Sequence, residues 1–196
     1  MNISTGRFGP LLAGAMAAFA VTAAAVDADA QEPKRGGTAI IQMKGEQRIL
    51  NPALRASTGV YYITGKIVEP LIDKSYDGYE PVLATEWSSS EDGLEITFKL
   101  REGVKWHDGE DFTCDDVSFT AMNMWKELLN YSTTLQQKLE AVDCPDPHTA
   151  VFKYSKPMPM DLMLAAMPDL GHPMPAHLYE GTDILKNEHN TAPVGT

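Results

Sequence analysis

Four aspartates in one short stretch, Asp108, Asp111, Asp115 and Asp116, are the first residues in this 196-residue sequence that could do chemistry. Two carboxyl groups held close together can serve as the acid and the base or nucleophile of a glycosidase or an aspartic-type hydrolase. Three of the four also have a local structural use. Asp108 precedes a glycine in a turn, whereas Asp115 and Asp116 fall in the first turn of a predicted helix, where the helix dipole favours negative charge by about 0.3 to 1 kcal/mol. The structural use is favoured, and an acid hydrolase is the weaker hypothesis.

Histidine and methionine side chains are the second candidates, because they could form a soft-metal site. They are His107, His148, His172, His177 and His189, with Met158, Met160, Met163, Met167 and Met174. Met160, Met163 and Met167 have the spacing of an ordinary buried helix face. His172 and His177 stand five positions apart with prolines between them, which is a poor geometry for two ligands on one helix. We therefore assign no metal and no cofactor. The sequence also lacks a glycine-rich phosphate loop and the G-x-S-x-G and H-E-x-x-H motifs.

The two cysteines, Cys114 and Cys144, are too few for a disulfide scaffold and too sparse for a zinc cluster. In an oxidising compartment two such residues are more often paired than free. Their spacing does not fix the distance between their Cα atoms, so two isolated buried thiols remain the alternative.

The first thirty residues are typical of a cleavable secretion signal. A short segment with Arg7 precedes an apolar run at 8–26, and Ala28-Asp29-Ala30 matches an A-x-A cleavage site. The run is rich in alanine and contains glycine and proline, so it is weakly hydrophobic for a permanent membrane anchor. No cysteine stands at the cleavage site, which excludes a lipid attached there. The sequence predicts a signal peptide at 1–30 and an exported chain that is not a lipoprotein.

The elements that must position these residues follow from apolar spacing and turn signals. They are a short buried strand at 38–43, a helix at 61–71, a hairpin of 83–87 with 94–100, a helix at 114–129, a strand at 149–154 and an apolar stretch at 162–167. Thr113 and Asp116 form a capping box at the start of the second helix, with Asp in place of the usual Glu. This order of elements predicts mixed α/β or α+β packing.

The charge of the chain restricts its partners. Sixteen Lys and Arg against 27 Asp and Glu give a formal charge of −11. That sign is wrong for neutralising a phosphate backbone, which argues against nucleic-acid binding, and it disfavours adsorption to anionic membranes. The length and the 43% hydrophobic content fit a globular chain of one medium domain or parts of two.

The most specific pattern in the sequence is residues 100–119, LREGVKWHDGEDFTCDDVSF. Five shorter motifs accompany it in order: Gly36-Gly37-Thr38, Leu50-Asn51-Pro52, Glu69-Pro70-Leu71, Leu83-Ala84-Thr85-Glu86-Trp87 and Asn190 to Thr196. With these motifs, residues 36–196 resemble the extracytoplasmic solute-binding proteins of family 5, the peptide- and nickel-binding components of ABC importers. The chain departs from the family at Cys114, where Ala is frequent, at Cys144, and at Asn51, where Asp is common. The disulfide would then be a feature of a subgroup.

The resemblance implies an α/β fold of the periplasmic-binding-protein type, class II, with two lobes that close about a hinge. It places the start of the main lobe, with its first strand, at 31–49, an inserted α+β domain at 50–170, and a return to the main lobe at 171–196. Family members continue with Gly-Pro-Tyr and a second lobe, so we expect an N-terminal fragment that holds only the first-lobe portion. Such a fragment alone would not enclose a solute, and the two main-lobe ends would fray.

In peptide binders of the family, the segment after the Leu-Asp-Pro motif lines the cleft and offers backbone groups to an extended ligand. The matching residues are Ala56, Ser57, Thr58 and Gly59, whose small size suits close backbone approach. Tyr131 roughly matches an aromatic position near the ligand. The acidic residue that pairs with a peptide's α-amino group belongs to the second lobe. Residues 100–119, by contrast, are a signature of the fold and not the binding site.

The function implied by the resemblance is that of a periplasmic solute-binding component of an ABC importer and not of an enzyme. It would be a monomer that captures a peptide or similar solute and delivers it to a membrane permease with its ATPase. The alternatives are a nickel or metal-complex binder of the same family and the acid hydrolase. The solute and the partner permease do not follow from the sequence.

Overall fold

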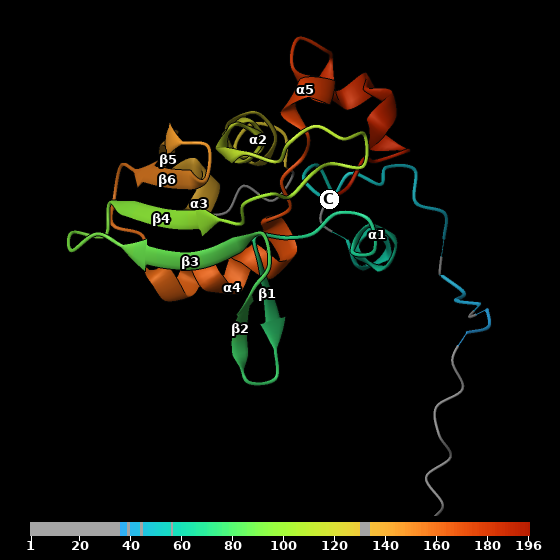
Figure 1. Cartoon of the computed structure of the whole chain (residues 1–196), viewed down its shortest axis with the longest axis horizontal. Helices are drawn as coiled ribbons and strands as arrows, with labels where there is room; N and C mark the ends of the chain where they lie inside the picture. Colours follow the sequence, from blue (N-terminus) through green and yellow to red (C-terminus); the bar gives the residue numbers. More distant parts are fainter. Residues whose placement is uncertain (1–35, 39, 44, 56, 130–133) are drawn as a thin grey trace, which may run out of the picture. The chain divides into compact units, whose positions relative to one another are not determined.

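The computed structural model describes residues 36–38, 40–43, 45–55, 57–129 and 134–196 (Figure 1). The chain divides into residues 1–40 and a compact unit of residues 41–196. The second unit contains every helix and strand of the described residues. None of these helices combines the length and the apolar character that a membrane crossing requires.

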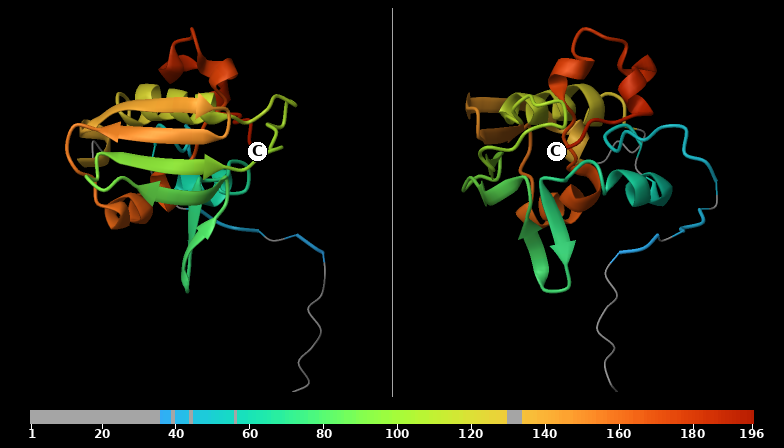
Figure 2. Two further views of the ribbon diagram at one scale, coloured as in Figure 1. Left: turned by 60° about the vertical axis from the view of Figure 1, so that its left-hand side comes forward. Right: turned by 45° about the vertical axis from the view of Figure 1, so that its right-hand side comes forward.

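Four antiparallel strands form the main sheet in the order β3-β4-β6-β5. They are β3 (Ala84–Ser89), β4 (Glu95–Leu100), β5 (Leu139–Asp146) and β6 (Thr149–Tyr154), and Figure 2 shows them side by side. In β4, Ile96, Phe98 and Leu100 are buried while the residues between them are more exposed, as the alternation predicted. The Phe98 ring packs edge-on against Phe152 of β6, with centroids 5.5 Å apart. The predicted hairpin and the predicted strand β6 are confirmed.

The remaining elements are helices, turns and a separate two-stranded hairpin. They are α1 (Thr58–Thr64), the hairpin β1 (Ile72–Ser75) and β2 (Gly78–Pro81), α2 (Cys114–Phe119), the π-helical segment η1 (Thr120–Trp125), α3 (Thr134–Gln137), α4 (Met160–Leu170), α5 (Ala176–Tyr179) and the 3-10 turns η2 (Ile184–Lys186) and η3 (Glu188–Asn190). Trp125 of η1 and Met163 and Met167 of α4 line one small internal void with Phe152 and Tyr154 of β6. Both helices therefore cover the same face, and these methionines belong to the core, as their spacing predicted.

The predicted capping box begins α2. The Thr113 hydroxyl accepts a hydrogen bond from the Asp115 N–H at 3.3 Å, and the Asp116 carboxylate accepts one from the Thr113 N–H at 3.0 Å. The helix predicted at 114–129 changes from α-helical to π-helical hydrogen bonding after Phe119. In η1 and just beyond it, the N–H of Lys126 bonds to the Ala121 carbonyl and that of Leu129 to the Met124 carbonyl, five positions back. The apolar stripe stays on the core side through this change.

Two predictions for the first part of the chain are wrong. The described residues of the segment 38–43 form no strand, and Ile41 is 73% exposed. A strand needs a neighbour to pair with, and no described strand of residues 41–196 pairs with this segment. The predicted helix at 61–71 is the shorter α1, because Ser57 caps it by accepting from the Val60 N–H and the chain turns after Thr64.

The segment at 171–196 packs against residues 50–170. The Ala176 N–H donates to Asp116 at 2.8 Å, the His107 N–H donates to the Gly195 carbonyl at 2.8 Å, and the Leu50 N–H donates to the Asn190 carbonyl at 2.6 Å. Residues 41–196 thus form one unit, and the division into lobes at 49/50 and 170/171 stays a prediction.

Candidate ligand-binding site

A hollow of about 440 Å³ lies between the start of α1 and the segment that follows Ile41. Its described lining residues are Ile41, Gln42, Met43, Gly45, Gln47, Thr58, Gly59 and Tyr62. None of these side chains carries a charge. Two of the predicted ligand-binding residues, Thr58 and Gly59, are among them. Amides, a hydroxyl and an aromatic ring make a surface suited to a neutral polar group or to the backbone of a peptide.

The other predicted ligand-binding residues have different places. Ser57 caps α1, and its hydroxyl lies 3.5 Å from Oε1 of Gln47. Gly59 packs so closely against Gln47 that an added Cβ would lie 2.5 Å from Nε2 of that side chain. A larger residue at position 59 would therefore displace the end of the Gln47 side chain. Ala56 and Tyr131 lie outside the described residues, and contact between any of these residues and a ligand stays a prediction.

Sequence reasoning missed Gln47 and Tyr62 as lining residues. The apolar stripe that predicted the first helix begins at Tyr61, so Tyr62 falls on the outer side of that helix. This position was the one signal in the sequence that Tyr62 is available to line a surface. Tyr62 is 64% exposed and lines the hollow. Gln47 carries no signal in the sequence, because it reaches Gly59 only through the tertiary fold.

The end of α4 holds α1 in place. The Tyr61 hydroxyl donates to the Asp169 carbonyl, and the Tyr61 ring stacks on His172 with centroids 5.6 Å apart and an interplanar angle of 22°. Burial raises the pKa of Tyr61, and the Asp169 carboxylate raises it further. Burial lowers the pKa of His172 to about 4, against the opposing influence of the Asp169 carbonyl and the Asp73 carboxylate. His172 is therefore neutral in the folded protein at pH 7.

Three of the four aspartates proposed for acid chemistry are engaged with structural partners. Asp116 is buried and accepts from three N–H groups, yet burial outweighs these bonds and raises its pKa. Asp108 pairs with Nε2 of His177 at 2.7 Å, and this hydrogen bond is the main cause that lowers the pKa of Asp108. Asp111 pairs with Lys105. The fourth, Asp115, is exposed in the first turn of α2. The cluster therefore serves the loop and the helix start, as its structural interpretation predicted.

Among the described residues, no three His, Cys, Asp or Glu side chains gather as possible metal ligands. Met163 and Met167 are buried in the core, and the Tyr154 hydroxyl lies 3.5 Å from the Met163 sulfur.

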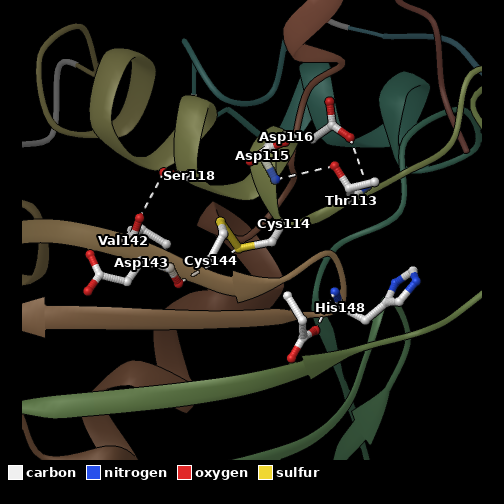
Figure 3. The surroundings of a disulfide bond; sticks show 10 residues. Thr113, Cys114, Asp115, Asp116, Ser118, Val142, Asp143, Cys144 and His148 are labelled. Atoms are coloured by element: carbon white, nitrogen blue, oxygen red, sulfur yellow. Dashed lines mark hydrogen bonds between the residues drawn. A yellow bond between two sulfur atoms is a disulfide. The ribbon is translucent and has the colours of Figure 1, made fainter.

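Cys114 and Cys144 are bonded, as predicted (Figure 3). Their Cα atoms are 5.7 Å apart, well within the range that a disulfide spans. The bond joins the first residue of α2 to the edge strand β5. Ser118 reinforces the same junction by donating from its hydroxyl to the Val142 carbonyl at 3.0 Å. Together these contacts cover the outer edge of the sheet at β5.

A buried polar network that the sequence did not predict ties the start of the unit to its end. Asn51 is fully buried, and its Nδ2 donates to the Tyr179 hydroxyl at 3.1 Å and to Oδ1 of Asn190 at 3.0 Å. Its Oδ1 accepts from the Ala53 N–H at 2.9 Å. The motif Leu50-Asn51-Pro52 is thus a structural anchor just before α1, and the amide of Asn51 supplies the donors.

The model of the bacterial extracellular solute-binding proteins, family 5 (middle), matches residues 78–196. That is more than half of the chain. The chain belongs to this family. The matched range holds the motif at 100–119, in which Trp106 donates to Asp116 and Cys114 forms the disulfide with Cys144.

Known family 5 and related binding proteins are similar to the chain in sequence and fold. The dipeptide-binding protein of Escherichia coli (strain K12) is 33% identical over 129 residues, which is 61% of this chain and 23% of that protein. The ABC transporter substrate-binding protein CtaP of Listeria monocytogenes has a TM-score of 0.70 at 29% identity, covering 83% of this chain and 33% of the other. NikZ of Campylobacter jejuni, described in complex with Ni(L-His), has a TM-score of 0.66 at 28% identity, covering 78% and 30%.

These likenesses establish the fold as part of a periplasmic-binding-protein architecture, with mixed helices and sheet. The chain spans between 8% and 34% of the length of the first curated relatives that it matches.

Proposed function

We propose that this family 5 protein is the extracytoplasmic solute-binding component of an ABC importer. It captures a small peptide or a similar solute without covalent chemistry and delivers it to a membrane permease and its ATPase. The observation that carries the proposal is the family match over residues 78–196. A neutral hollow beside Thr58 and Gly59 supports it, because uncharged walls with amides and a ring suit a peptide backbone.

The proposal includes export and the state of the protein after export. Residues 1–30 act as a cleavable signal, no lipid is attached, and the mature protein is a periplasmic monomer. The names of two relatives support this location, a periplasmic alpha-galactoside-binding protein of Rhizobium meliloti and a probable D,D-dipeptide-binding periplasmic protein of Escherichia coli. The bond between Cys114 and Cys144 also suits an oxidising compartment.

A second candidate within the family is the binding of nickel as a complex. The similarity to NikZ, which is described with Ni(L-His), favours it over a bare ion. A metal that brings its own histidine also needs fewer protein ligands than a bare ion.

A thermal-shift panel on the product of the whole gene tests both candidates. The panel contains dialanine, a mixed tripeptide pool, Ni(L-His), free Ni²⁺ and raffinose as an α-galactoside. A binder gains RT ln(1 + [L]/Kd), about 2.7 kcal/mol at one hundred times Kd, only with its own solute. Peptide-specific stabilisation supports the main proposal, and stabilisation by Ni(L-His) alone supports the second. Chemical conversion of a solute that is lost in Asp108→Asn or Asp115→Asn would contradict both and restore the hydrolase.

A further inference from the structure

Helix α1 forms one wall of the hollow but is too short to hold its own position. It has seven residues, and an isolated helix of that length is not stable in water. Two adjacent tyrosines have different surroundings: Tyr62 is 64% exposed and lines the hollow, whereas Tyr61 contacts the end of α4. Val60 and Thr64 of α1 are buried, and the contacts of Tyr61 attach the helix to the end of α4 as well.

Tyr61 is held from two directions at the end of α4. Its hydroxyl donates to the Asp169 carbonyl, and its ring stacks on His172. The residue between the end of α4 and His172 is also fixed, because the Gly171 carbonyl accepts from the Leu71 N–H at 2.7 Å. Segments that are about one hundred residues apart in the sequence thus meet at one aromatic stack.

His172 is an unusual residue for this position. It is 4% exposed, and its Nδ1 has no hydrogen-bond partner. The groups that face it are the Tyr61 ring from α1, the Asp73 carboxylate from β1 and the Asp169 carbonyl from α4. A buried nitrogen without a partner costs free energy that a phenyl ring of similar shape would not. Stability alone would favour phenylalanine here.

We propose that Tyr61 and His172 are a positioning pair, which fixes α1 against the end of α4 and releases it when His172 is protonated. Ser57, Thr58 and Gly59 move with α1, so the pair sets the shape of the hollow. One part of this proposal rests on the proposed function: that a change in the position of α1 changes the binding of the solute. A proton on the ring would place a positive charge on a side chain that is 4% exposed, and the lost solvation of that charge is the physical reason for the release.

Hydrogen exchange tests the pair without any ligand. We compare the wild-type protein with His172→Ala, which removes the ring, and His172→Phe, which keeps a ring for Tyr61. The reporters are the amides of Val60, Tyr61 and Gly65, which are bonded within or at the ends of α1. The references are amides of β4 and β6. At pH 7 we expect the alanine variant to lose about tenfold of protection in α1 and the phenylalanine variant to retain it.

The pH dependence separates positioning from ordinary packing. Between pH 7 and pH 5 the wild type should lose protection in α1, whereas His172→Phe should not. Equal protection of α1 in all three proteins would overturn the proposal. Unchanged protection of α1 in the wild type over this pH range would also overturn it, since His172 would then leave its site only when the whole fold unfolds.

Binding of dialanine, measured by calorimetry, tests the consequence for the solute. If the wild type binds, the alanine variant should bind about tenfold more weakly and the phenylalanine variant equally well. Equal binding by the alanine variant would separate α1 from the solute site and overturn that part of the proposal. If the wild type binds neither dialanine nor the tripeptide pool, the peptide function fails, while the exchange experiment still decides the role of the pair.

Discussion

Replacing Asp116 by Asn should destabilise the protein strongly, although the two side chains have nearly the same shape. Oδ2 of Asp116 accepts from the Thr113 N–H at 3.0 Å and from Nε1 of Trp106 at 3.1 Å, and Oδ1 accepts from the Ala176 N–H at 2.8 Å. The amide of Asn has one oxygen, so its NH2 group must face at least one of these N–H donors. This single carboxylate joins the loop, the start of α2 and the start of α5.

The magnitude follows from opposing contributions. Each lost hydrogen bond to a charged group costs about 1.5 to 3 kcal/mol, and the donor left facing the NH2 group adds to that cost. The raised pKa of Asp116 shows that burying its charge is itself unfavourable, and the neutral Asn avoids this. We therefore expect a net loss of about 2 to 3 kcal/mol at pH 7.

Urea unfolding, read as a shift of the midpoint at constant slope, measures this loss. The matched control is Asp115→Asn in the same helical turn. That carboxylate is exposed, so its loss should cost less than about 1 kcal/mol through the helix dipole. A change below about 0.5 kcal/mol for Asp116→Asn, or equal effects of the two variants, would refute the reasoning.

Three further predictions concern the disulfide, the buried histidine and the buried amide. The double variant Cys114→Ala/Cys144→Ala should lose about 3 to 4 kcal/mol in urea unfolding, because a loop of 30 residues is released; two reactive thiols in the unreduced, denatured wild type would contradict the bond. His172 has a folded pKa of about 4, below its unfolded value of about 6.5, so the folded state binds fewer protons between these limits. Stability should therefore fall by about 2 kcal/mol from pH 7 to pH 5 relative to His172→Phe, and parallel pH profiles would exclude this linkage. Asn51→Asp places a carboxylate against Oδ1 of Asn190. The free energy of unfolding should fall by about 1 to 3 kcal/mol at pH 7 and by less at pH 4. An unchanged free energy of unfolding would show that the network rearranges.

Local signals carried most of the correct predictions. The alternation at 94–100 and the capping box of Thr113 and Asp116 depend on neighbours within a few residues, so the sequence contains what they need. The strand β5 was missed because three acidic residues and a proline interrupt its apolar pattern and because it is held from outside, by the disulfide and by Ser118. The prediction of a strand at 38–43 was wrong because it relied on apolar residues alone. A strand also needs a neighbouring strand to pair with, and apolar residues do not supply one.

The candidate site was only partly accessible from the sequence. Ser57, Thr58 and Gly59 came from the family resemblance, and no composition or spacing rule singles them out. Gln47 reaches Gly59 across the fold, and the stack of Tyr61 on His172 joins positions about one hundred residues apart. Such contacts depend on how the whole chain packs, which periodicity and capping rules do not determine.

The most direct test of solute capture is titration calorimetry of the whole gene product against the panel of solutes, with product analysis of each mixture. We predict saturable binding of one peptide class at one site per chain, with every solute recovered unchanged. Absence of binding to every solute in the panel, or chemical conversion of any of them, would contradict the assignment as a solute-binding component.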